Sequence, residues 1–274
     1  MRFLLVTTCF AFSWMGVVFA DSVAFLSLDP TASGQIYASW YAQGSHAETL
    51  WYNPATLRDT PVSIHASHTY YLRDISYNAL SFSYHNYAAG VLYNTDGIMS
   101  ETWLRGAYTL HVQNFSIASS LTYYAASIQN PERVHADAEA SGKGSSISLH
   151  CAYRSDVLRA GVTVHNVWGE VTWDSTYYDQ EISLSHKEQL ERSVSATVVY
   201  SIDPFQFAIG THNDALCASL AYTISTLTFV AGYRDEFPVY SLGVVATTPT
   251  LHISCGYILT PYVHYYTAGI TFFP

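Results

Sequence analysis

The sequence predicts an all-β protein, a transmembrane antiparallel β-barrel of about fourteen strands with an N-terminal plug segment. Three observations indicate this class: a secretory leader, a charged-residue content of 12%, and repeated short runs of alternating apolar and polar residues. The charged content is about half the globular norm of ~25%, so much of the surface must face something other than water. After the leader no run approaches ~20 consecutive apolar residues, and a closed barrel is the other architecture that satisfies its backbone in lipid.

Residues 1–20 have the organisation of a cleaved signal peptide. Arg2 supplies the basic start, residues 3–18 form an apolar stretch, and small Ala20 favours cleavage before Asp21. A transmembrane anchor would need a longer apolar stretch and a positive stop-transfer cluster, and a lipoprotein would need a smaller residue before Cys9. We therefore expect residues 21–274 to be exported.

The chain from residue 62 onward alternates with period two, as strands with one apolar face do. Each run is close to the ~10 residues that a tilted transmembrane strand needs. The predicted strands are 62–71, 75–84, 87–94, 103–112, 115–126, 145–154, 157–168, 193–202, 204–211, 215–224, 227–234, 238–247, 249–258 and 264–273.

The predicted connections differ between the two rims. Those at one rim are tight, whereas those at the other include the long segments 95–102, 127–144 and 169–192. Bacterial barrels show this asymmetry, with the long loops outside. Segment 169–192 is interpreted as an acidic, aromatic loop that is either a solvated rim or a partner-binding surface, and one more hairpin within it would give sixteen strands.

Charge is sparse inside the predicted strands. None of the 21 acidic residues falls in them, and the only basic residues there are Arg105, Arg154, Arg159 and Arg234. The faces opposite the apolar ones read mostly Ser, Thr, Ala, Gly and His, which predicts a nearly neutral lumen suited to apolar cargo rather than ions. A net charge of −10 with eleven basic residues excludes nucleic acid as a partner.

The end of the chain is typical of outer-membrane barrels. Tyr266, Ala268, Ile270 and Phe272 alternate with smaller or polar residues and give an aromatic final strand. Twenty-three tyrosines and six tryptophans are available for two aromatic girdles. We expect the outer membrane of a diderm bacterium as the location, with its lipid and the barrel-assembly machinery as partners.

The most specific motif lies just ahead of the first strand. It reads Leu50-Trp51-Tyr52-Asn53-Pro54-Ala55 and follows the small-residue stretch 32–38, while 65–77 carries Ser-His-Thr before an acidic residue and a tyrosine. Over roughly 31–93 this resembles the FadL family of long-chain fatty acid transporters and its shorter PorV-related members. The resemblance implies a fourteen-stranded barrel, an N-terminal plug, and passage of hydrophobic substrates toward a lateral opening.

The resemblance assigns residues 21–60 to the plug and 61–274 to the barrel. It implies that Asn53, Pro54 and Ala55 hold the plug against the wall, with Trp51 and Tyr52 beside them as ligand-binding or gating residues. Independently, about fourteen strands enclose a lumen too wide for side chains to fill, so a plug is needed. The alternative for Asn-Pro-Ala is a simple turn, because proline fixes φ and disfavours a helical residue before it.

Catalysis and metal binding have weak support in the sequence. Ser67, Ser148 and Ser254 each lie two positions from a histidine, but no predicted strand carries an acid to complete a triad. Cys151, Cys217 and Cys255 have no CxxC or zinc-ligand spacing and are interpreted as small strand residues. We therefore expect no enzymatic activity, no metal and no cofactor.

The predicted function is passive, plug-gated uptake of hydrophobic small molecules such as long-chain fatty acids. The chain is much shorter than the fatty acid transporters, so a large external pocket is not expected. The alternative function is that of a structural or adhesive outer-membrane barrel that presents surface loops without transport.

Overall fold

The computed structural model describes most of the chain after the expected leader. Within the described residues, no helix is long and apolar enough to cross a membrane. The leader, 1–20, lies outside these residues, as does most of the predicted plug before residue 46. The described residues are 34, 37, 42, 44, 46–57, 62–72, 75–95, 99–128, 138–177, 182–212, 215–235, 238–261 and 264–273.

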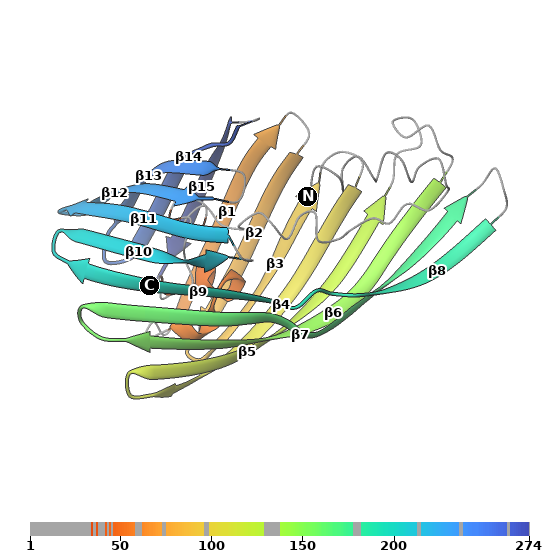
Figure 1. The fold of residues 1–274 in the computed structure, drawn as a ribbon, viewed down its shortest axis with the longest axis horizontal. Coiled ribbons are helices and arrows are strands. Elements are labelled where there is room, and N and C mark those ends of the chain that lie inside the picture. The colour runs from red at the N-terminus through yellow and green to blue at the C-terminus, as the bar shows by residue number, and fades with distance from the viewer. Residues whose placement is uncertain are drawn as a thin grey trace.

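Fifteen strand segments follow two short 3-10 turns, all paired antiparallel (Figure 1). The two turns are η2 (Ala47–Trp51) and η3 (Pro54–Thr56). The strands are β1 (Val62–Leu72), β2 (Ile75–Tyr84), β3 (Tyr87–Thr95), β4 (Met99–Val112), β5 (Phe115–Ile128), β6 (Ala138–Arg154), β7 (Leu158–Tyr177), β8 (Ile182–Gln189), β9 (Ser193–Ile202), β10 (Phe205–His212), β11 (Ala215–Ile224), β12 (Leu227–Arg234), β13 (Val239–Thr247), β14 (Leu251–Leu259) and β15 (His264–Phe272).

The segments close into a fourteen-stranded barrel, as predicted. β1 pairs with β15 and β6 pairs with β7, which joins the two ends of the sheet. The count falls from fifteen to fourteen because β8 and β9 pair with successive halves of β7 and together make one barrel strand. Closure pairs both edges of the barrel strands, as a structure surrounded by lipid requires, and only β8, in the extension beyond the shorter strands, has one neighbour among the described residues.

The prediction that 95–102, 127–144 and 169–192 are long loops is wrong. β4 begins at Met99 within the first of these segments, β5 and β6 extend into the second, and β7 pairs with β8 across most of the third. This hairpin lengthens existing strands, so it does not raise the count to sixteen. β4 to β7 consequently reach beyond the shorter β10 to β14 at one end, as Figure 1 shows. The extension also brings Glu101 into a strand, against the prediction that strands lack acids.

The two faces of the wall differ as a membrane barrel requires. Leu80, Leu104 and Leu121 are about half exposed on the outer face, whereas Ser81 and Ser120 on the inner face are nearly inaccessible. The alternation persists along β2, β4, β5 and β15. An apolar outer band around a polar interior is the arrangement of a barrel that contacts hydrocarbon.

The connections at one rim are all short, as predicted. They span 85–86, 113–114, 155–157, 203–204, 225–226 and 248–250. His85, Gln113 and Ser225 in three of them adopt positive φ angles of 50 to 57°, as the first residue of a tight hairpin turn must. Short turns mark the periplasmic rim of bacterial barrels, so we call this rim the turn end.

The wall is irregular where β6 pairs with β7. The pairing of β6 with β7 shifts register between Ile147 and Leu149, and Asn166 of β7 has a φ of 50°. The break between β8 and β9 lies on the other side of β7, where the Asn166 amide donates to the carbonyl of Glu191 at 3.0 Å and Arg192 donates to the carbonyl of Val167. These side-chain bonds replace the ladder bonds that the break removes.

Candidate functional site: the barrel lumen

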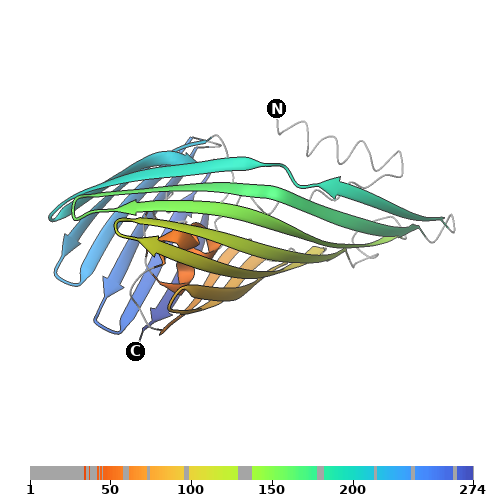
Figure 2. The ribbon, with the colours of Figure 1, turned by 90° about the horizontal axis from the view of Figure 1, so that it is seen from below.

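The segment 46–57, here called the inner segment, lies inside the barrel. Figure 2 shows its two turns, in orange, surrounded by the strands. Every residue of η2 is buried, and Leu50 and Tyr52 are at most 1% exposed. A segment this well buried contributes to the hydrophobic core rather than to a solvated linker.

The five residues predicted for the site come together against the wall. Trp51, Tyr52, Asn53 and Ala55 are at most 3% exposed, and Pro54 is buried too. Asn53 Oδ1 accepts a hydrogen bond from the Ala55 amide at 3.1 Å, which caps η3. Its Nδ2 donates to the carbonyl of Cys151 on β6 at 3.0 Å. The motif therefore makes both a turn and a wall contact, which the sequence had left as alternatives.

Hydroxyl groups of the wall bind the main chain of the inner segment on both sides of Asn53. Thr109 of β4 donates to the Pro54 carbonyl at 2.8 Å, and Thr163 of β7 donates to the Tyr52 carbonyl at 3.1 Å. Buried carbonyls without partners are costly, and Thr163 satisfies that of Tyr52, whereas the Pro54 carbonyl receives Thr109 in addition to the Leu57 amide at the end of η3. The small polar lumen side chains thus serve as a hydrogen-bonding surface for this segment.

Arg105 of β4 joins the wall to the inner segment through a buried guanidinium. Its Nε donates to Thr122 Oγ1 of β5 at 2.8 Å, and its Nη1 donates to the Trp51 carbonyl at 3.0 Å and more weakly to that of Leu50 at 3.4 Å. The guanidinium also lies 5.6 Å from the Trp51 ring centroid, a cation–π distance. Only a planar multi-donor group makes all these contacts at once.

A second set of contacts holds η2 at its start. The Ala47 amide donates to Ser63 Oγ at 2.8 Å, and Ser81 donates to the Ala47 carbonyl at 2.8 Å. Ser63 also shares a 2.6 Å hydrogen bond with Ser83. Both main-chain groups of Ala47 are therefore bound by serines of β1 and β2.

Glu48 is an acid inside the lumen, and sequence reasoning missed it. Its Oε2 accepts from Thr271 at 3.1 Å and lies 3.4 Å from His65 Nδ1. Burial by itself raises the pKa of this carboxyl, but the imidazoles of His252, His65 and His46 and the Thr271 hydrogen bond outweigh burial, so the pKa lies below its ordinary value. The ionised carboxylate thus ties η2 to β1 and β15.

The histidines of the lumen are held by hydroxyl groups. His150 is hydrogen-bonded to Ser120 at 2.9 Å through Nε2 and to Thr163 at 3.0 Å through Nδ1. Ser148, which the sequence analysis weighed as a nucleophile, accepts a hydrogen bond from the main-chain amide of Asn166. Among the described residues, no cluster of three or more potential metal ligands occurs.

The prediction of a nearly neutral lumen is wrong in one respect. Arg105 and Arg234 are each 8% exposed and Glu101 is 2% exposed on inner faces, and Glu48 adds a further charge. These charges are few and buried, whereas Lys187 and Glu170 pair at an exposed site on the strand extensions. The role of Arg105 could not be assigned from the sequence, because the carbonyls that it binds lie about fifty residues earlier in the chain.

An aromatic row lies on the inner face beyond the inner segment, on the side away from the turn end. Leu92, Trp103, Tyr124 and Val171 are consecutive across β3 to β7, with Gly144 of β6 between the last two. The Trp103 and Tyr124 rings meet edge to face at 5.4 Å. All four side chains are at most 6% exposed and form one apolar cluster with the inner segment. We call these four residues the aromatic row.

Gly90 of β3 allows the inner segment to reach the wall. A Cβ at this position would lie 2.8 Å from both Leu50 Cδ2 and Trp51 Cζ2, and 2.7 Å from the Leu80 carbonyl oxygen. We expect Gly90→Val to displace the inner segment and to lower the free energy of unfolding by about 1–3 kcal/mol, measured by urea titration in detergent. Gly106→Val is the matched control, because a Cβ there meets nothing within 4 Å, and equal destabilisation by both would contradict the close packing.

No family model matches the sequence, and no curated protein matches it. Solved structures with a similar fold include the CymD monoaromatic hydrocarbon channel, with a TM-score of 0.58 and 13% identity over 90% of this chain and 97% of that one. The toluene transporter TodX of Pseudomonas putida has a TM-score of 0.55 and 12% identity, over 88% of this chain and 96% of that one. A FadL homologue of Pseudomonas aeruginosa has a TM-score of 0.55 and 10% identity, over 88% of this chain and 96% of that one.

The chain has the fold of the FadL-type outer-membrane channels. The resemblance predicted from residues 31–93 is thus confirmed for the architecture of the whole barrel. The FadL-type neighbours are named as channels and a transporter, which fits the prediction that this chain is not an enzyme.

Proposed function

We propose that this chain is an outer-membrane channel for passive uptake of hydrophobic small molecules, and that the segment 21–60 is a plug that gates it. The observation that carries the proposal is the inner segment, which is buried in the lumen and bound to the wall mainly through main-chain groups. Such contacts hold a segment in place whatever its side chains are, and each is modest in energy, on the order of 1 kcal/mol. A plug held this way closes the lumen and can still move.

The aromatic row supports an apolar cargo. It gives the lumen an apolar wall directly next to Trp51 and Leu50, within the same cluster. Ligand sites for apolar molecules are lined by such side chains with a few placed polar groups. The names of CymD and TodX, a monoaromatic hydrocarbon channel and a toluene transporter, agree with this class of cargo. Long-chain fatty acids are the specific cargo that we propose for this chain.

Trp51, Tyr52, Asn53, Pro54 and Ala55 are the proposed gating residues. Asn53 is the most direct latch, because its side chain caps η3 and also reaches β6. Loss of the Asn53 side-chain amide removes both the hydrogen bond to the Cys151 carbonyl and the cap of η3. Trp51 lies beside the latch and packs against Arg105, so its environment should change when cargo displaces the plug.

The test is a tryptophan-fluorescence titration of the refolded chain 21–274 in detergent with a long-chain fatty acid. The intact chain is compared with a variant carrying Asn53→Ala and Pro54→Ala. We expect saturable binding in the intact chain and weaker binding in the variant. No saturable response in either protein would reject the fatty-acid cargo and favour the alternative, a structural or adhesive barrel that displays its outer loops without transport.

A further inference from the structure

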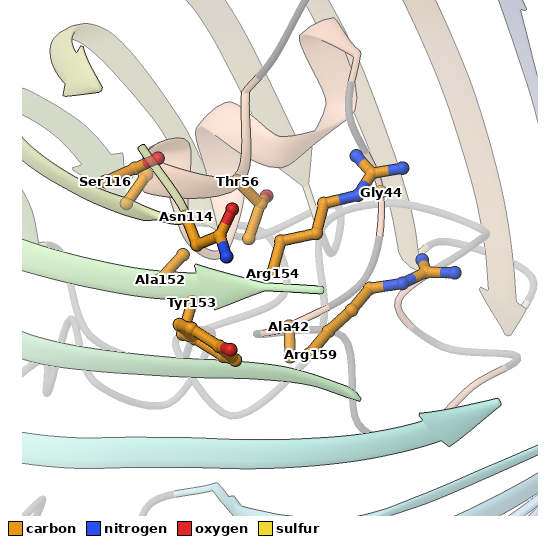
Figure 3. A pocket seen from close by; sticks show the side chains of 10 residues that line it. Ala42, Gly44, Thr56, Asn114, Ser116, Ala152, Tyr153, Arg154 and Arg159 are labelled. Carbon is orange, nitrogen blue, oxygen red and sulfur yellow. The ribbon is translucent and has the colours of Figure 1, made fainter. Parts of the chain in front are cut away.

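A small pocket lies at the turn end of the lumen, between the inner segment and β5 to β7 (Figure 3). About 300 Å³ of empty space, which includes open solvent, lies between its lining residues. Ala42, Ala55 and Ala152 give it an apolar floor, and Asn114 lies at its edge in the β4–β5 turn. Apart from Ala55 and Thr56, none of its lining residues belongs to the inner segment or to the aromatic row.

Two arginines line the pocket from neighbouring strands. Arg154 of β6 and Arg159 of β7 are direct cross-strand partners. Both continue lumen-facing series, since His150 and Ala152 precede Arg154 at two-residue spacing and Thr163 follows Arg159 on the same face. Figure 3 shows the two side chains extending in the same direction, past Gly44.

The two guanidinium groups have no hydrogen-bond or ion-pair partner among the residues that the structure describes. Arg105 contrasts with them, because three carbonyl or hydroxyl oxygens receive its protons. Like charges directly opposite on a sheet destabilise it. A pair of like charges that has no acceptor among the described residues is suited to an anion from outside the chain.

The chemistry of the pocket selects one class of anion. Paired guanidinium forks match the two oxygens of a carboxylate, and the alanine floor suits an apolar tail. The outer face at this level carries the Phe115 and Tyr153 rings, 5.0 Å apart, as an aromatic girdle would. Lipid phosphates would therefore meet aromatic rings on the outside, while the arginines face the lumen.

We propose that Arg154 and Arg159 form a carboxylate-binding subsite at the periplasmic mouth, which receives the head of an amphipathic carboxylate leaving the lumen. The inference rests on the proposed uptake function and names the exit step of it. The subsite draws the charged head past the plug, while the apolar tail follows from the aromatic row. A neutral hydrocarbon has no carboxylate, so the subsite does not increase its affinity.

The experiment compares dodecanoate with dodecan-1-ol, which share a chain length and differ in charge. Binding to the detergent-solubilised chain 21–274 is measured by calorimetry at about pH 8, where the carboxylate is ionised. For the double variant Arg154→Gln and Arg159→Gln we expect affinity for dodecanoate to fall about tenfold or more, because charge-assisted hydrogen bonds are lost. Affinity for dodecan-1-ol should change less than about twofold, since the apolar floor is intact.

Two control proteins define the cause. Lys143→Gln with Lys187→Gln removes the same charge from exposed positions on the strand extensions and should leave both affinities unchanged. Arg154→Lys with Arg159→Lys keeps the charge but not the planar fork, and should bind dodecanoate with intermediate affinity. Removing the opposed charges should not reduce folding, which is checked by gel mobility with and without heating.

The outcomes are distinguishable. Equal dodecanoate binding by the intact chain and the Gln variant would overturn the subsite. So would binding of inorganic phosphate alone that needs both arginines while dodecanoate binding does not. Uptake of dodecan-1-ol into proteoliposomes is measured alongside: uptake with no arginine effect on dodecanoate rejects only the subsite, whereas arginine-dependent binding without uptake rejects only the transport function.

Discussion

Replacing Arg105 with alanine is expected to make the barrel leak small polar solutes, because this side chain links the wall to two carbonyls of the inner segment. Each hydrogen bond to a charged group is worth roughly 1.5–3 kcal/mol. A loss of about 3 kcal/mol from the closed state would raise the open population by roughly two orders of magnitude. Single-channel conductance in a planar bilayer measures the effect directly.

Two variants isolate the cause of that leak. Arg105→Lys keeps a charge but cannot bridge Thr122 and the Trp51 carbonyl as the guanidinium does, so we expect an intermediate conductance. Arg192→Ala removes an exposed arginine that bonds only the Val167 carbonyl of the wall, and its conductance should match that of the intact chain. A closed Arg105→Ala channel would show that the guanidinium does not hold the plug.

Replacing Tyr124 with alanine is expected to weaken the binding of a neutral aromatic hydrocarbon such as toluene by about tenfold or more. The aromatic row loses a ring that packs edge to face on Trp103, and a fully buried aromatic side chain is worth about 1.5–3 kcal/mol. Calorimetric titration in detergent gives the dissociation constant of the variant and of the intact chain.

Tyr123→Ala is the matched control for the aromatic row. Tyr123 is the adjacent residue of the same type, but it is 43% exposed on the outer face, whereas Tyr124 is 6% exposed on the inner face. Equal weakening by the two substitutions would mean that toluene binds at the outer surface or that the effect is a general loss of stability. No weakening by Tyr124→Ala would remove the aromatic row from the cargo path.

The barrel itself could be predicted because its information is local. Alternation with period two and tight turns places strands such as 145–154 close to their observed positions. The strand extensions could not be recognised, since 138–144 contains Gly142 and Gly144 and reads as a turn. In the structure a Cβ at Gly142 would overlap the Trp173 ring, and Gly144 approaches the backbone at Val171. These glycines serve cross-strand packing, which a single strand does not reveal.

The candidate site was predictable only in part. The Asn53 motif stands out in the sequence, and the structure places it against the wall. Glu48 and Arg105 could not be assigned, because the partners of each side chain lie on segments far away in the sequence. The predicted strands place Arg154 and Arg159 near strand ends, which sets their distance from the rim but does not show which side chains they meet. Only the paired register of β6 and β7 shows that they meet over the lumen.

The most direct test of plug-gated uptake compares the chains 21–274 and 61–274 in proteoliposomes, after gel mobility has shown that both barrels are folded. The account predicts that the longer chain admits dodecan-1-ol and retains sucrose, while the shorter chain releases sucrose because its lumen is open. Equal sucrose retention by both chains, or equal release, would contradict the account, since residues 21–60 would then not close the lumen.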